Sequence, residues 1–143
     1  MLALVLGTSW LVGCGAEEEP FADYCAEVQE QQEPLSEALA GDGATALLAA
    51  LPSFEALAAA SPPDIADEWR TLLDAVGALR TALEEAGVDP ASYDRADPPP
   101  GLAQADRDRI DAAARGLTRP ATIAALAGVQ QQARDVCKTP LSL

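Results

Sequence analysis

The chain has no histidine, one lysine, Lys138, and eight arginines. The missing histidine excludes Ser-His-Asp triads, histidine metal ligands and an imidazole pH switch. Aromatic residues make up 4% of the sequence, although 49% of it is hydrophobic. A core must therefore consist mainly of Leu, Ala, Val and Ile, and this composition, poor in strand formers, favours helices.

Positive charge is also scarce. Nine basic residues stand against 23 acidic ones, which gives a net charge of -14 at pH 7. This charge argues against nucleic-acid binding and against a basic membrane-contact patch, because polyanions and anionic lipids would be repelled. The length of 143 residues suffices for one domain with one modest hydrophobic core.

An apolar run at residues 2–12 opens the chain. Its length lies within the ~7–15 residues of a signal peptide's apolar region and falls short of the ~20 that span a bilayer. The run ends in Leu11-Val12-Gly13-Cys14, which resembles a bacterial lipobox, the site of signal peptidase II. In that pattern Leu11 fills the −3 pocket, small Gly13 precedes the cut, and the Cys14 thiol is acylated.

The lipobox resemblance implies a division of the chain into a signal peptide (1–13, removed), a lipidated cysteine with a short acidic tether (14–20) and a single helical domain (21–143). Cys14 would carry diacylglycerol, so the protein would be exported and lipid-anchored at the outer face of the cell membrane. The six tether residues after Cys14 reach at most ~20 Å, which keeps the domain close to its membrane. Two other interpretations remain: a secreted protein with a free Cys14, and a cytosolic protein with an apolar N-terminal helix.

Hydrophobic periodicity predicts two helices before residue 61. The first, Phe21 to Ala40, should kink at Pro34, whose ring displaces the hydrogen bond to the carbonyl of residue 30. The second, Ala44 to Ala60, contains Pro52, so it either kinks there or splits, with Ser53 capping its second half.

The strongest pattern predicts a third helix from Asp64 to Ala86 that stops at Gly87. Its apolar seam repeats at spacings of four and three and comprises Ile65, Trp69, Leu72, Val76, Leu79 and Leu83. An acidic, proline-rich loop, Val88 to Leu102, follows, and then a short helix from Gln104 to Gly116. The last predicted helix runs from Pro120 to Lys138. The side chains expected to face the core are those of Ile123, Leu126, Val129, Ala133 and Val136.

Three cysteines are an odd number, but lipidation of Cys14 leaves Cys25 and Cys137 as a pair in an exported, disulfide-permissive compartment. They lie near the start of the first helix and at the end of the last, where an antiparallel up-down four-helix bundle joins its chain ends. We therefore expect an all-α fold of this kind, closed by a Cys25–Cys137 disulfide. The short helix before the last one should be a cap or a kinked forerunner, since a full fifth member would carry Cys137 to the opposite pole.

If Cys25 lies opposite Cys137 in an antiparallel pair of helices, residues that lie opposite each other have numbers that sum to 162. It places Gln31 opposite Gln131 and Gln32 opposite Gln130. These glutamines form a polar layer if both pairs face inward, and such a layer would set the helix register or line a polar pocket. Otherwise they are simply good exposed helix formers.

Motifs of catalysis are absent from the sequence: it has no G-x-S-x-G elbow, phosphate-binding glycine loop, G-x-G-x-x-G or zinc-ligand spacing. The acidic series Asp106, Asp108 and Asp111 lacks the glycine and distal glutamate of an EF-hand, which favours a solvated helix start. We therefore expect a protein that is not an enzyme and has no catalytic residues, no cofactor and no metal.

The lipobox, the Phe21 to Cys25 opening and the late Cys137 resemble the small, Ala-rich helical lipoproteins of actinobacterial cell envelopes. That resemblance implies a location and no activity. Our first hypothesis is a non-enzymatic protein-interaction module that engages an unknown envelope protein through the loop Val88 to Leu102. The alternative is a small-molecule or lipid binding protein with a pocket between kinked helices, lined by Leu47, Leu51, Phe54 and Trp69.

Overall fold

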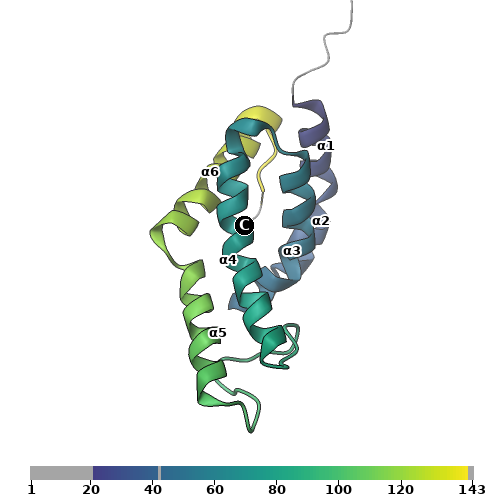
Figure 1. Ribbon diagram of the computed structural model, residues 1–143. Helices are drawn as coiled ribbons and strands as arrows, with labels where there is room; N and C mark the ends of the chain where they lie inside the picture. The colour runs from purple at the N-terminus through teal and green to yellow at the C-terminus, as the bar shows by residue number, and fades with distance from the viewer. Residues whose placement is uncertain (1–20, 42, 142–143) are drawn as a thin grey trace, which may run out of the picture.

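The computed structural model describes residues 21–41 and 43–141, and over these ranges the chain forms helices and no strand (Figure 1). The all-α prediction is confirmed for this part of the chain. Six α-helices and one short 3-10 helix follow one another: α1 Ala22–Glu30, α2 Gln32–Ala38, α3 Gly43–Ala60, η1 Pro63–Ile65, α4 Ala66–Glu85, α5 Gln104–Leu117 and α6 Pro120–Cys137.

The predicted first helix is interrupted, so that α1 and α2 meet at Gln31. The cause is Pro34, which has no N–H to donate to the carbonyl of Glu30. The Gln31 N–H still donates to the Glu27 carbonyl at 2.9 Å, and the Leu35 N–H donates to the Gln31 carbonyl at 2.9 Å. The chain therefore bends at Gln31, as predicted, and keeps helical hydrogen bonds on both sides of the bend. Both α1 and α2 pack against α3.

Pro52 does not divide α3, which is one helix from Gly43 to Ala60. Of the two outcomes left open at Pro52, a kink or a split, the split is excluded, because Ser53 lies inside the helix and is buried. By length and composition alone, α3 is the one helix of the described residues that is long and apolar enough to cross a membrane. Core helices pass the same test, and α3 supplies Ala50, Leu51, Phe54 and Leu57 to the core.

The central helix is α4, against which α3, α5 and α6 all pack (Figure 1). Its predicted seam is confirmed, since all six seam residues from Ile65 to Leu83 are buried. The helix begins directly after η1 and ends before Gly87, whose φ of 68° is the left-handed conformation that glycine adopts without strain. Close approach of α6 is possible at Gly128, where an added Cβ would lie 3.2 Å from the Glu68 Cγ.

Consecutive helices α5 and α6 cover different parts of α4. Ile110 of α5 is fully buried with Leu79 and Leu83 in a core cluster near the end of α4. In α6, Val129 and Ala133 join the cluster around Trp69, nearer the start of α4. The helices α5 and α6 therefore lie along different stretches of α4, and Figure 1 shows the bend between them.

One prediction for α6 is wrong, because Ile123 is 55% exposed. The buried positions are instead Thr122, Ala125, Val129 and Ala133. Each step of three residues turns a helix through only about 300°, so the i+3 series 123, 126, 129 moves off one face by about 60° per step. Steps of four residues compensate for this drift, and the buried positions are indeed linked by spacings of three, four and four.

Two isoleucines in neighbouring helices give a matched test of this packing. Ile110→Ala should lower the free energy of unfolding by about 2–5 kcal/mol, because it leaves a cavity in the core. Ile123→Ala should change it by less than about 0.5 kcal/mol, because the side chain is solvated. Urea unfolding followed by circular dichroism measures both variants, and an equal loss in the two would contradict the packing of α5 and α6.

Candidate functional site

The lipobox Leu11 to Cys14 and the tether residues 15–20 lie outside the described residues. Signal-peptide cleavage and lipid attachment at Cys14 therefore stay predictions. The described domain begins at Phe21, directly before α1.

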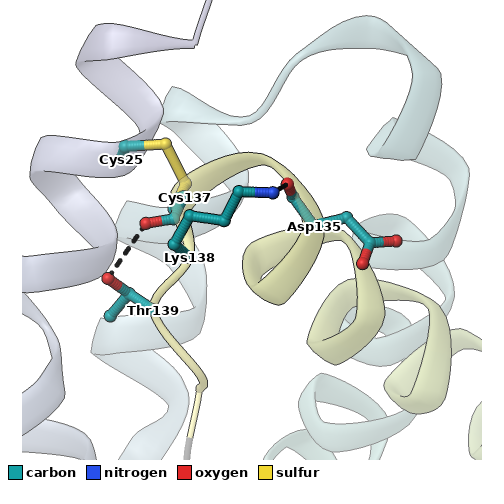
Figure 2. The surroundings of a disulfide bond; sticks show 5 residues. All are labelled: Cys25, Asp135, Cys137, Lys138 and Thr139. Carbon is teal, nitrogen blue, oxygen red and sulfur yellow. Dashed lines mark hydrogen bonds between the residues drawn. A yellow bond between two sulfur atoms is a disulfide. The ribbon is translucent and has the colours of Figure 1, made fainter.

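The disulfide between Cys25 and Cys137 is present and links α1 to the end of α6 (Figure 2), so the predicted pairing is confirmed. Their Cα atoms are 5.1 Å apart, although 112 positions separate them in the sequence. Beside the bridge, Lys138 adopts a left-handed φ of 56° and donates from Nζ to the Asp135 carbonyl at 2.6 Å. The Thr139 Oγ1 donates to the Cys137 carbonyl at 3.1 Å, which fixes the turn after α6.

Gln31, Gln32 and Gln131 form hydrogen bonds with residues other than the glutamines predicted to lie opposite them. Gln31 donates to the Glu27 carboxylate at 2.8 Å and Gln131 donates to the Asp135 carboxylate at 2.8 Å, so each bond stays within one stretch of helix. The side chain of Gln32 is exposed and donates to the carbonyl of Pro140, which follows α6 near the other end of the chain, at 3.1 Å. Because Gln32 and Gln131 are both exposed, these two residues favour the solvated interpretation over a buried layer.

The remaining predicted member, Gln130, is half-buried on α6.

Sequence reasoning missed a group of buried polar atoms near the disulfide. The Tyr24 hydroxyl, the Trp69 Nε1 and the Gln132 Oε1 are buried without a hydrogen-bond partner in the described part of the chain. Burial raises the pKa of Tyr24 above its ordinary 10.0, and the nearby Trp69 indole only partly opposes this rise. The amide nitrogen of Gln132 reaches the Asp64 carboxylate at 3.3 Å, so the group joins α1, η1, α4 and α6.

A signal for Tyr24 was available in the sequence. The spacing from Tyr24 to Val28 is one helical turn, and Leu35 follows at a further two turns, so these three residues share a face. All three are buried in the observed core. Phe21, three residues before Tyr24, is only half-buried.

The loop 88–102 lies at the end of the molecule opposite the disulfide (Figure 1). The Gln132–Asp64 contact places the start of α4 beside the end of α6, whereas the loop follows the other end of α4. The loop is held in place, because Thr45 Oγ1 donates to the Tyr93 carbonyl at 3.1 Å and Arg95 Nε lies 2.9 Å from the Asp111 carboxylate. We call the loop, together with residues 43–45 and 104–114 that it meets, the loop pole.

Two hollows of the loop pole share Tyr93 and Arg95 as lining residues. The larger, of about 380 Å³, is also lined by Leu79 of α4 and Ala114 of α5. The smaller, of about 160 Å³, is completed by Pro98, Arg107 and Asp111. Burial is the largest cause of the raised pKa of Tyr93, and Asp111 adds to it.

A further groove of about 350 Å³ runs along α4 at the bend between α5 and α6, where Thr71 and Asp74 face Gly116 and Ala121. An adjoining hollow of about 200 Å³ shares Thr71 and Ala121 with it. Alanines form much of both walls, together with Asp74 and Arg119 in the groove and Asp67 and Glu68 in the adjoining hollow. This groove offers less for specific recognition than the loop pole, where a tyrosine and two arginines converge.

The pocket predicted between the kinked helices falls in a packed part of the core. Leu51, Phe54 and Trp69 are each at most 2% exposed, and the rings of Phe54 and Trp69 lie 6.4 Å apart. None of the four hollows described above has any of these residues in its lining.

Two carboxylates of the acidic series contact arginines, and the third, that of Asp108, accepts a hydrogen bond from Gln104 at 2.8 Å. Asp106 accepts a hydrogen bond from Arg109, and Asp111 pairs with Arg95. Across the described ranges, no group of three or more Cys, Asp or Glu residues is arranged to hold a metal ion.

No family model matches this sequence, and neither a curated protein nor a solved structure is significantly similar to the chain.

Removing the disulfide should destabilise the domain. The double variant Cys25→Ser with Cys137→Ser should lose about 2–4 kcal/mol of unfolding free energy, since the bridge restricts the unfolded chain. Urea unfolding measures this loss, and the m-value should rise because the unbridged unfolded chain exposes more surface. Cys14→Ser serves as the control and should leave both quantities unchanged. Equal midpoints for bridged and unbridged chains would contradict the stabilising role.

Proposed function

We propose that this protein is a lipid-anchored lipoprotein of the cell envelope that acts as a non-enzymatic protein-interaction module. The anchor is the diacylglycerol on Cys14, at the outer face of the membrane, and the partner is an envelope protein bound at the loop pole. In this proposal α1 with α2, α3, α4 and α6 act as an antiparallel up-down four-helix bundle, in which α5 is an added element.

The ordered loop 88–102 is the observation that carries the interaction role. Loops of more than about 12–15 residues without secondary structure are uncommon in compact domains and often functional. This one contacts α3 through Thr45 and α5 through Asp111. Asp89 and Asp94 add turns in which their carboxylates accept the N–H groups of Ala91 and Ala96. A loop that is already ordered loses less conformational entropy when a partner binds.

The placement of the poles supports the anchored arrangement. The disulfide holds Cys25, in the first turn of α1, beside the end of α6. An anchor that precedes Phe21 by a short tether would hold this end of the domain near the membrane. The loop pole would then face away from the membrane, where it is accessible to another envelope protein.

A specific observation also favours the alternative, a small-molecule or lipid binding protein. The larger hollow of the loop pole measures about 380 Å³. Pockets for small molecules usually measure roughly 300–1,000 Å³ and combine an apolar lining with a few polar groups. Under this alternative the ligand binds beside Tyr93 and not between the kinked helices.

The anchor is tested with Cys14→Ser in cells that are labelled with an alkyne-bearing fatty acid. The variant should lose the acyl label and leave the membrane fraction, because no other cysteine occupies the lipobox. The matched control, Cys25→Ser with Cys137→Ser, should keep the label. Labelling of the Cys14→Ser variant at the native level would contradict the lipoprotein assignment.

The interaction surface is tested with a photo-crosslinking amino acid placed at Ser92 or Asp97, which are both exposed in the loop. Intact cells should yield a discrete crosslinked protein from these positions, identified by mass spectrometry. The same probe at Arg134, exposed on α6, is the control and should not yield that protein. Identical products from all three positions would contradict recognition at the loop pole.

A further inference from the structure

The two hollows beside Tyr93 differ in chemistry. The larger has a mostly apolar lining that includes Ala44, Leu79, Tyr93 and Ala114, and Asp94 also lies on its wall. The smaller is lined by Arg95, Arg107 and Asp111, and the Arg95 guanidinium is paired with the Asp111 carboxylate at 2.9 Å. Since Tyr93 and Arg95 line both hollows, an apolar body in the larger one would lie next to the cationic groups of the smaller one.

Arg107 is the basic residue that stands out. It is half-buried, and its Nε donates to the Leu102 carbonyl at 3.2 Å. Arg70, Arg80, Arg95 and Arg109 form ion pairs. The other four arginines, Arg107, Arg115, Arg119 and Arg134, form none with the described residues, and of these only Arg107 is half-buried. In a chain with 23 acidic residues, a half-buried guanidinium without a carboxylate partner beside a hollow indicates a place for an external anion.

The net charge restricts which anion fits. A chain of net charge -14 repels anions more strongly as their charge rises. Screening confines this repulsion to roughly 8 Å at physiological ionic strength, so one short-range contact with an arginine can outweigh it for a single charge. The planar guanidinium matches the two oxygens of a carboxylate. A carboxylate therefore suits this site better than a doubly charged phosphate.

We propose that the loop pole binds a monocarboxylate with an apolar body, which lies in the hollow between Leu79 and Ala114 while its carboxylate contacts Arg107. This inference rests on the proposed function, because it names the chemical group that the loop pole recognises. The carboxylate belongs either to a free aliphatic acid or to the apolar C-terminal residue of the partner protein.

The primary test is calorimetric titration of the full chain with octanoate and, for comparison, with octyl phosphate. Octanoate should bind, and octyl phosphate should bind more weakly. Arg107→Gln should weaken octanoate binding at least about tenfold through loss of a charge-assisted contact. Arg115→Gln is the matched control on the same helix, exposed and outside both hollows, and should stay within about twofold of the native chain.

The larger hollow is tested with Ala114→Phe, which should fill it and abolish octanoate binding. The control Ala112→Phe alters an exposed alanine outside both hollows of the loop pole. Methyl NMR of the native chain gives an independent readout if the larger side chain impairs folding. Octanoate should shift the methyl signals of Ala44, Leu79 and Ala114 and leave that of Ile123 unchanged.

A third titration distinguishes the two sources of the carboxylate, using acetyl-Gly-Gly-Leu and its C-terminal amide. Tighter binding of the acid peptide than of octanoate, lost in the amide, assigns the ligand to a protein C-terminus. Tighter binding of octanoate assigns it to a free acid.

The proposal is overturned if the native chain does not bind octanoate or the acid peptide at millimolar concentration, or if Arg107→Gln binds as well as Arg115→Gln. Neither result bears on crosslinking at Ser92, which requires a protein partner and no carboxylate. The monocarboxylate site and the interaction module can therefore fail separately.

Discussion

The packing of the neighbouring helices on the apolar seam of α4 is the interaction on which the rest of this structure depends. Few aromatic residues are available, and the largest fully buried side chains are those of Trp69, Tyr24 and Phe54. The rings of Trp69 and Phe54 lie 6.4 Å apart where α3 meets α4. The same helix α4 also contacts α5 and α6. The disulfide then joins α1 to the end of α6.

The two ends of the molecule differ in chemistry as a consequence. At the disulfide end, a covalent bridge joins α1 to the end of α6, and polar atoms of Tyr24, Trp69 and Gln132 are buried nearby without a hydrogen-bond partner among the described residues. At the loop pole, side chains of the loop 88–102 complete a second core cluster around Ile110 and leave hollows beside Tyr93. The first arrangement suits a fixed attachment point, and the second offers concave surface with a cationic group. This division is the basis of the proposed function.

Helix positions could be predicted from the sequence wherever a local rule applied. The seam of α4 repeated over several turns, Gly87 supplied a stop, and Pro34 supplied a bend, and all three were correct. The sequence left two outcomes open at Pro52, and the prediction at Ile123 failed. Pro52 is accommodated within α3 without a break, and the face of α6 was misjudged at Ile123 because a series of i+3 steps drifts around a helix.

By itself the sequence determined the helical class and the seam of α4, since composition and periodicity act locally. It also indicated the pairing of Cys25 with Cys137, on the condition that Cys14 carries lipid. Only the tertiary structure decided that Tyr24 is buried beside Trp69 and that Arg107 borders a hollow next to Tyr93. Those facts depend on contacts between residues far apart in the chain. No local pattern specifies such contacts, because they follow from the angles at which whole helices and the loop 88–102 pack together.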